Sequence, residues 1–161
     1  MRKTSITVLF LLALFVLSTE TVRAQNTMAV GAHFGIDLDQ DATFIGAQAR
    51  FGGASLPIRI QPGLDYGLNE DDPYWRIEVN GLYLIGEDYT TSFTPYVGPG
   101  IALTFAEDEN DDTETNFGIN IVAGIEFRPI FQILSPYVQA RYTLQSGADP
   151  LGVMGGLLVR F

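Results

Sequence analysis

Beyond residue 25, apolar and polar positions alternate along the chain with a period of two, in runs of about ten residues. This period places successive side chains on opposite faces of a β-strand, and clusters of glycine, proline, asparagine and aspartate separate the runs. No long helical period occurs in this part of the chain. The pattern therefore predicts eight strands, at roughly 28–36, 43–51, 58–66, 74–85, 93–105, 116–127, 136–144 and 152–161.

The two faces of these strands differ in chemistry. One face is aliphatic and aromatic and carries no charge. The opposite face is polar and charged, with His33, Gln48, Arg50, Arg59, Gln61, Asp65, Arg76, Glu78, Asn80, Asn120, Glu126, Gln139, Arg141 and Arg160. A soluble barrel turns its apolar face inward, but this polar face is too charged for a dry core. We therefore predict an all-β fold, an eight-stranded antiparallel up-and-down transmembrane β-barrel with its polar face inside.

Aromatic residues and carboxylates mark the two ends of the predicted barrel. At one end we expect an aromatic girdle of Phe34, Tyr66, Trp75, Phe105, Phe117 and Tyr142. At the other end we expect Phe51, Phe93, Phe127, Tyr137 and Phe161. The connections at the first end, 37–42, 67–73, 106–115 and 145–150, carry thirteen of the eighteen carboxylates beyond residue 24. The turns at the second end carry Glu87 and Asp88, so the two ends are expected to face different compartments.

The final run, 152–161, places Leu157, Val159 and Phe161 on one face and Arg160 on the other. An apolar strand that reaches the last residue is unusual for a soluble protein, since termini are commonly frayed and polar. Lipid would cover such a face without further protein. The alternative is an ordinary closing strand of a soluble β-sandwich.

The first two dozen residues have the pattern of a secretory signal peptide. Arg2 and Lys3 precede an apolar run at 6–17, and Val22-Arg23-Ala24 supplies small residues at −3 and −1 of a cleavage site. We expect residues 1–24 to be removed, leaving 25–161 as one exported barrel domain without a transmembrane helix. That domain has six arginines, no lysine and a formal charge of −12. A polyanion would be repelled, so nucleic acid is excluded as a partner.

Several of these features resemble the small OmpA/OmpX-like (opacity-protein-like) outer-membrane β-barrels. They are the leader, the eight alternating strands, the repeats Pro95-Tyr96-Val97 and Pro136-Tyr137-Val138, Gly98-Pro99-Gly100 and terminal Phe161. The resemblance implies the outer membrane of a Gram-negative-type bacterium, contact with outer-membrane lipid and lipopolysaccharide, and folding by the barrel-assembly machinery, with Phe161 in the assembly signal. That family includes anchors, adhesins and resistance factors, so it does not define a function. Unlike OmpA, the chain stops at the barrel, which argues against a peptidoglycan-binding domain.

The inward-facing charges suggest a network that closes the lumen. We expect Arg50, Arg59, Arg76, Arg141 and Arg160 to pair there with Asp65, Glu78 and Glu126, because an eight-stranded barrel is just wide enough to be filled by side chains and buried charges must be paired. By the same parity Arg128 lies at the lower end of the lumen. A narrow ion path or small-ligand pocket is the alternative.

Two features could carry chemistry. His33 is the only histidine and faces the lumen, but no Ser–His pair at strand spacing accompanies it. A lipid A-modifying enzyme is therefore a minor alternative, and we expect a hydrogen-bonded interior histidine. Residues 106–115 form the densest acidic run. A weak divalent-cation site is conceivable there, although the EF-hand pattern fails because Thr113 and Ile119 replace its glycine and glutamate; its candidates are Asp108, Asn110, Asp111 and Asp112.

Together these observations favour a monomeric outer-membrane barrel with a structural or surface-interaction role. We expect no cofactor, no structural metal and no catalytic activity. The first alternative is a binding or transport module that uses the lumen for a small solute or an ion, and a lipid-modifying enzyme is the second.

Overall fold

The computed structural model describes residues 26–39, 42–53, 56–68, 73–86, 92–107, 113–130, 133–146 and 150–161. The predicted signal peptide, residues 1–24, and its cleavage site lie outside these ranges. Within them, no helix has the length and apolar character needed to cross a membrane.

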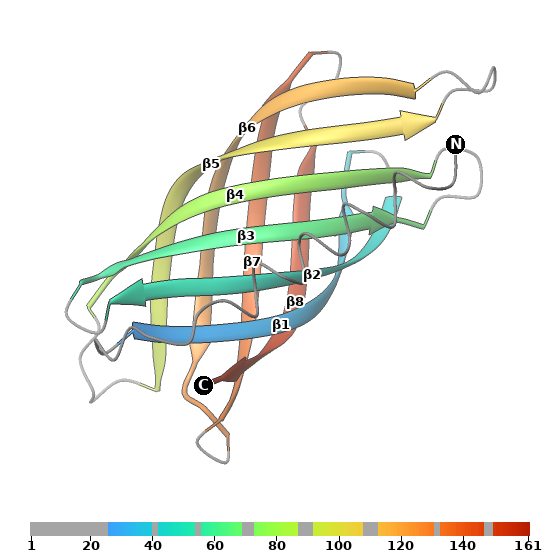
Figure 1. Cartoon of the computed structure of the whole chain (residues 1–161). Coiled ribbons are helices and arrows are strands. Elements are labelled where there is room, and N and C mark those ends of the chain that lie inside the picture. The colour runs from blue at the N-terminus through green and yellow to red at the C-terminus, as the bar shows by residue number, and fades with distance from the viewer. Residues whose placement is uncertain are drawn as a thin grey trace, which may run out of the picture.

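Eight antiparallel strands form a closed barrel (Figure 1). They are β1 (Asn26–Asp37), β2 (Ala42–Gly53), β3 (Ile58–Gly67), β4 (Tyr74–Leu84), β5 (Phe93–Glu107), β6 (Thr113–Phe127), β7 (Leu134–Gln145) and β8 (Leu151–Arg160). Each strand pairs with the next, and β8 closes the sheet against β1. The predicted fold class and the eight strands are confirmed.

The strand bounds differ most from the prediction at the tips of β5 and β6. Thr113, Glu114 and Thr115 are polar, but they continue the ladder opposite Glu107, Ala106 and Phe105. Backbone hydrogen bonding does not require apolar side chains, so a hairpin can extend beyond its apolar segment. The end at which β5 meets β6 in this hairpin is called the upper end below, and the end at which β1 begins and β8 finishes is the lower end.

The orientation of the two faces is as predicted. Outward side chains are apolar: Phe34, Trp75, Ile101 and Leu157 are each about half exposed. Inward side chains include the charged and amide groups, most of them buried. Because the strand period is two, the pairing register keeps this arrangement from strand to strand, as in the pair Ala32 and Leu157. The exterior suits a bilayer, and the closed sheet leaves no unpaired edge within it.

The aromatic residues of the two predicted girdles lie on the outer face except Tyr137, and their place at the membrane interfaces stays a prediction. Tyr66 and Trp75 pack together at the upper girdle with ring centroids 4.7 Å apart, and Phe93 lies opposite Phe127 at the lower one. Tyr137, however, is 1 % exposed and points into the barrel. Its neighbour Val138 faces outward, so the strand period requires Tyr137 to face inward.

The interior contains apolar side chains as well as polar ones. One apolar cluster joins β1, β2, β7 and β8 and consists of Ala29, Phe44, Tyr137, Met154 and Leu158. The other joins β4, β5 and β6 and consists of Leu82, Leu84, Tyr96 and Val122. These clusters fill space beside the polar groups, so the lumen is packed by both kinds of side chain.

Candidate functional site in the barrel interior

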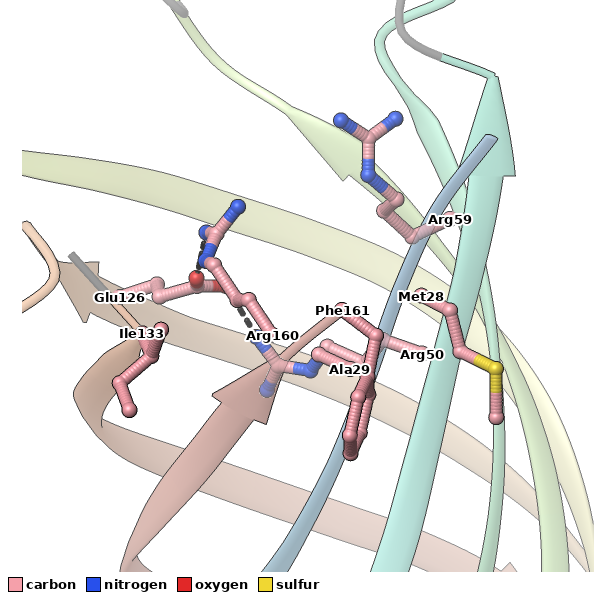
Figure 2. Close-up of a pocket in the computed structure, with 8 residues that line it drawn as sticks. All are labelled: Met28, Ala29, Arg50, Arg59, Glu126, Ile133, Arg160 and Phe161. Atoms are coloured by element: carbon pink, nitrogen blue, oxygen red, sulfur yellow. Dashed lines mark hydrogen bonds and ion pairs between the residues drawn. The ribbon is translucent and has the colours of Figure 1, made fainter. Parts of the chain in front are cut away.

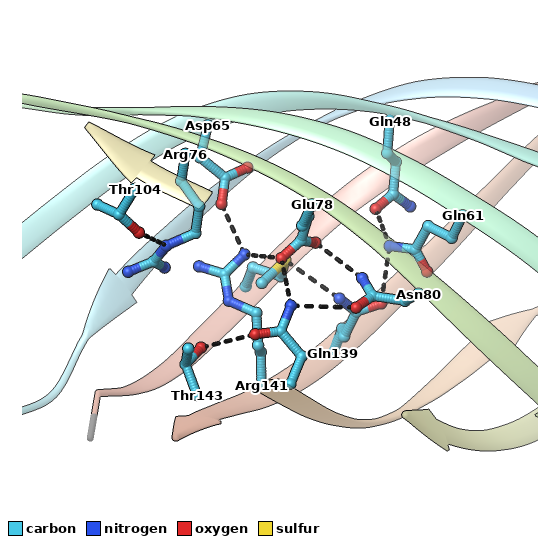
Figure 3. Close-up of polar contacts among 12 residues, drawn as sticks. Gln48, Gln61, Asp65, Arg76, Glu78, Asn80, Thr104, Gln139, Arg141 and Thr143 are labelled. Atoms are coloured by element: carbon cyan, nitrogen blue, oxygen red, sulfur yellow. Dashed lines mark hydrogen bonds and ion pairs between the residues drawn. The ribbon is translucent and has the colours of Figure 1, made fainter. Parts of the chain in front are cut away.

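Arg141 forms the centre of the polar interior (Figure 3). It extends from β7 and is fully buried. Its Nη1 donates to Asp65 Oδ2 on β3 at 2.6 Å and to Glu78 Oε2 on β4 at 2.8 Å. One guanidinium thus holds two buried carboxylates that would otherwise repel each other. We call Arg141, Asp65 and Glu78 the central cluster.

His33 on β1 is tied to this cluster. Its Nε2 lies 2.8 Å from Asp65 Oδ1, and its ring packs edge-on against Phe44. Gly46 on β2 lies opposite both His33 and Asp65, and a Cβ there would collide with both side chains. The glycine therefore provides the space in which the histidine and the carboxylate meet across one strand.

A belt of neutral amides lies next to the central cluster. Asn80 Nδ2 donates to Glu78 Oε1 at 2.9 Å, and Asn120 Nδ2 donates to Glu78 Oε2 at 3.1 Å. Gln61 on β3 donates to Gln48 on β2 and, at 3.3 Å, to Gln139 on β7. We call these five residues the amide belt. All five side chains are buried, and the bonds of Gln61 to Gln139 and of Asn120 to Glu78 connect strands that are not neighbours in the sheet.

The upper end of the lumen carries a further ion pair. Arg76 Nη1 lies 3.7 Å from Asp37 Oδ2, and Arg76 Nε donates to Thr104 Oγ1 at 3.3 Å. Tyr74 donates its hydroxyl to Asp37 Oδ2 at 2.7 Å. The prediction that Asp37 belongs to the acidic connection 37–42 is wrong. Asp37 is the last residue of β1 and is buried, because strand parity turns it inward toward Arg76.

A second charged group lies toward the lower end. Arg50 Nη1 donates to Glu126 Oε2 at 2.7 Å, and Arg160 Nη2 bonds the other oxygen of the same carboxylate. Arg50 also donates to the Tyr96 hydroxyl at 2.8 Å. Its guanidinium lies 4.6 Å from the Tyr96 ring centroid and 4.8 Å from that of Tyr137. We call Arg50, Glu126 and Arg160 the lower cluster.

The two tyrosines that enclose Arg50 come from the repeated Pro-Tyr-Val segments of β5 and β7. Sequence reasoning did not assign either tyrosine to the interior network. A signal was available, because each precedes a valine that faces outward and is therefore confined to the inner face.

The nine charged residues and the histidine assigned to the interior do not form one uniform network. His33, Asp65, Glu78 and Arg141 come together, Arg50, Glu126 and Arg160 come together, and Arg76 joins Asp37 above them. Arg59 is also buried, but its Nη1 donates to the backbone carbonyls of Leu56 and Ile58. Arg128 is exposed just beyond β6.

A cavity of about 410 Å³ opens next to the lower cluster (Figure 2). Among the described residues of its lining, Arg50, Arg59 and Arg160 contribute guanidinium groups and Glu126 contributes a carboxylate. Met28, Ile133 and other apolar residues line the remainder. This cavity was not located by sequence reasoning, because its walls come from strands far apart in the chain.

The candidate cation ligands Asp108, Asn110, Asp111 and Asp112 lie outside the described residues. Within the part of the chain that is described, no group of three histidine, cysteine, aspartate or glutamate side chains is placed to hold a metal ion. The cation site in the acidic connection therefore stays a prediction.

No protein-family model matches the sequence, and no curated protein matches it either. Solved structures do match in shape. The N-terminal β-barrel domain of Pseudomonas aeruginosa OprF superposes with a TM-score of 0.72 at 14 % identity, over 85 % of this chain and 98 % of that one. Neisserial surface protein A matches with a TM-score of 0.63 at 15 % identity, over 84 % and 96 % of the two chains.

A third match is Ail, the attachment invasion locus protein of Yersinia pestis, with a TM-score of 0.56 at 12 % identity over 87 % of this chain and all of that one. At these identities the likeness concerns the fold. The chain thus has the fold of the small OmpA/OmpX-like outer-membrane β-barrels, as the sequence features indicated.

Proposed function

We propose that the protein is a monomeric outer-membrane β-barrel with a structural or surface-interaction role, whose lumen is closed by its own side chains and which catalyses no reaction. The observation that carries this proposal is the fully buried central cluster together with the amide belt. These groups bond to one another across the barrel interior, which is where a solute would have to pass.

The location in the outer membrane is supported by the exterior and by the fold. Apolar side chains predominate on the outer face of all eight strands, and the matched structures include outer-membrane barrels. Lipid and lipopolysaccharide are the partners that such an exterior fits, and the barrel-assembly machinery is the partner that an aromatic closing strand with Phe161 fits.

The proposal of a closed lumen is supported by the hydrogen bonds that side chains make across the barrel. Gln61 on β3 bonds Gln139 on β7, and Arg50 on β2 bonds Glu126 on β6. Arg141, Gln61 and Gln139 have no exposed surface. An eight-stranded barrel has an interior just wide enough for side chains, so bonds of this kind leave little room for a continuous water path.

The absence of catalysis is proposed from the contacts of His33. Its imidazole bonds Asp65, and Arg141 holds the same carboxylate. The histidine is therefore tied into an ion-pair network, and a general base would instead need to reach a hydroxyl nucleophile or a substrate. Mass spectra of lipid A from cells with and without the gene would test this part, and we expect identical spectra.

A surface role is proposed from the upper connections. Those connections are rich in carboxylates, Glu114 near the start of β6 is exposed, and one matched structure is that of Ail, the attachment invasion locus protein of Yersinia pestis. A negative rim attracts divalent and polycationic groups weakly and in a salt-dependent way. We therefore expect loose cation association around residues 107–114 and no tight protein partner bound by charge alone.

Conductance measurements test the closed lumen. The protein reconstituted in a planar lipid bilayer should give no current steps above leak, with an open porin as the positive control. The double variant Gln61→Gly with Gln139→Gly removes two members of the amide belt and shows whether a widened lumen would be detected. Reproducible conductance from the unaltered protein would overturn the proposal.

A further inference from the structure

We infer that the lumen holds a binding site for one ordered water molecule at Gly152, where the water joins Asp37 near the upper end to Arg141 in the central cluster. The inference concerns a single position inside the barrel and goes beyond the surface role proposed above. It holds whether or not the lumen conducts, because it depends only on the groups around this glycine.

Gly152 on β8 lies directly between Asp37 and Arg141 in the sheet. It pairs with Asp37 of β1 on one side and with Arg141 of β7 on the other. Residues that lie directly opposite each other in a sheet project to the same face, so both side chains lie over the inner face of the glycine. All three residues are buried, and Asp37 and Arg141 are 1 % and 0 % exposed.

The same arrangement occurs at Gly46, with a different outcome. Gly46 lies between His33 and Asp65, and the two side chains meet directly at 2.8 Å. The side chains on either side of the glycine in β8 do not meet in this way. Asp37 Oδ1 and Arg141 Nη2 each have no hydrogen-bond partner among the described residues. A complementary acceptor and donor therefore lie on either side of one glycine without contacting each other.

The other polar contacts of these two side chains involve different atoms. Asp37 accepts from the Tyr74 hydroxyl through Oδ2, and the same oxygen lies near Arg76. Arg141 donates to both carboxylates of the central cluster through Nη1, and Figure 3 shows another nitrogen of its guanidinium pointing away from them. A buried polar atom without a partner is costly, so a third group that bonds to both Asp37 Oδ1 and Arg141 Nη2 would be stabilising.

The missing side chain of Gly152 provides the room for that group. A Cβ at this position would lie 2.7 Å from Asp37 Oδ1, 3.6 Å from Arg141 Nη2 and 3.7 Å from Phe44 Cε1. The two polar atoms therefore border the same small space, and the fully buried Phe44 ring closes one side of it. A buried water needs at least two polar partners and room for about one molecule, and the space over the glycine offers both.

Water is the ligand whose chemistry fits both partners. It can donate a hydrogen bond to Asp37 Oδ1 and accept one from Arg141 Nη2. A metal cation would be repelled by the guanidinium, and an anion would be repelled by the carboxylate. The bound water connects the pair of Asp37 and Arg76 to the central cluster, so the charged groups in the upper half of the lumen form one hydrogen-bonded network.

A crystal structure of the unaltered, folded barrel tests the inference, at a resolution that shows water molecules. We expect density for one water within hydrogen-bond distance of both Asp37 Oδ1 and Arg141 Nη2. A direct hydrogen bond between these two atoms would overturn the inference. So would a metal ion or an anion at this position, or the absence of density there.

Two alanine variants on β8 test the role of the glycine. Gly152→Ala places a methyl group in the space and should remove the water. Gly155→Ala is the matched control, because its Cβ faces outward and meets the Tyr137 carbonyl oxygen at an ordinary distance of 3.9 Å. Deuterium magnetic relaxation dispersion, which counts long-lived internal waters, should give one water fewer for folded Gly152→Ala than for Gly155→Ala. Equal counts would contradict the inference, and if Gly152→Ala fails to fold, the structure of the unaltered barrel still decides.

Discussion

The central cluster and the lower cluster both consist of arginine and carboxylate side chains, but they differ in charge balance and in burial. In the central cluster one arginine, Arg141, is enclosed between Asp65 and Glu78 and has no exposed surface. In the lower cluster two arginines share Glu126, and Arg160 remains partly exposed. The central arginine is fully buried between its carboxylates, whereas the lower cluster leaves part of one guanidinium accessible. The comparison shows that the accessibility of an interior arginine varies with the number of carboxylates around it and with its distance from the end of the barrel.

We also expect the position of each arginine along the barrel axis to affect how much it contributes to the free energy of unfolding. In the middle of the lumen, water cannot replace a lost partner. Removing one member of a buried ion pair therefore leaves the other charge uncompensated. At the lower end the Arg160 side chain is 38 % exposed, and Glu126 keeps a second arginine when one is removed. The following predictions test this difference.

The largest effect is expected for Arg141→Ala. Removing this guanidinium leaves Asp65 and Glu78 buried close together without their cation, and should lower the free energy of unfolding by about 3–5 kcal/mol. Urea unfolding from liposomes, followed by the fluorescence of the single tryptophan, Trp75, measures it.

Arg160→Ala is the matched control and should cost less than about 1 kcal/mol, because the side chain is partly exposed and Arg50 continues to hold Glu126. Adding Asp65→Asn and Glu78→Gln to Arg141→Ala should recover much of the loss, because the repulsion is removed. Equal costs for Arg141→Ala and Arg160→Ala would show that depth in the lumen does not control the contribution.

The next effect concerns the outer face of the same strand that carries Arg160. Leu157 faces outward from β8, so Leu157→Arg would place a charge in the lipid and should cost about 2–4 kcal/mol if the site lies near the midplane. Arg160→Leu keeps the outer face unchanged and should be milder. Folding yields into liposomes compare the two variants, and equal tolerance would contradict the assignment of inner and outer faces.

Most of the fold could be predicted from the sequence, because each strand alternates strictly between lipid and lumen and a slip of one residue would reverse every side chain. Parity likewise placed Arg141 and Glu78 inside. It could not show that they meet, because the contact depends on how distant strands curve toward each other. Tyr137 shows a different limit: aromatic residues near a strand end suggest a membrane girdle, yet this one is required inside by its neighbour Val138.

The sequence also could not distinguish the buried central cluster from the partly exposed lower cluster. Arg50 and Arg141 are both arginines on the inner face, and their spacing along the chain does not say which one is matched by two carboxylates. The difference arises from where Asp65, Glu78 and Glu126 lie along the barrel axis, and from the glycine at position 46 that lets His33 and Asp65 approach.

The smallest effect is expected for the two tyrosines around Arg50, which form a matched pair. The Tyr96 hydroxyl accepts from Arg50 Nη2 at 2.8 Å and donates to Gln139 Oε1 at 3.0 Å, so it links the lower cluster to the amide belt. The Tyr137 hydroxyl is buried and has no hydrogen-bond partner among the described residues. Both rings pack against the same guanidinium at nearly equal distances.

Tyr96→Phe should therefore cost about 1–2 kcal/mol in the free energy of unfolding, because it removes the hydrogen bond that Arg50 Nη2 donates to the hydroxyl and one of the two that Gln139 Oε1 accepts. Tyr137→Phe should be neutral or slightly stabilising, since it removes a buried hydroxyl that makes no bond and keeps the ring over Arg50. Unfolding from liposomes with Trp75 as the reporter measures both. If the two substitutions had the same cost, the tyrosines would act only through their rings, and the hydroxyl link between the lower cluster and the amide belt would contribute nothing to the closure of the lumen.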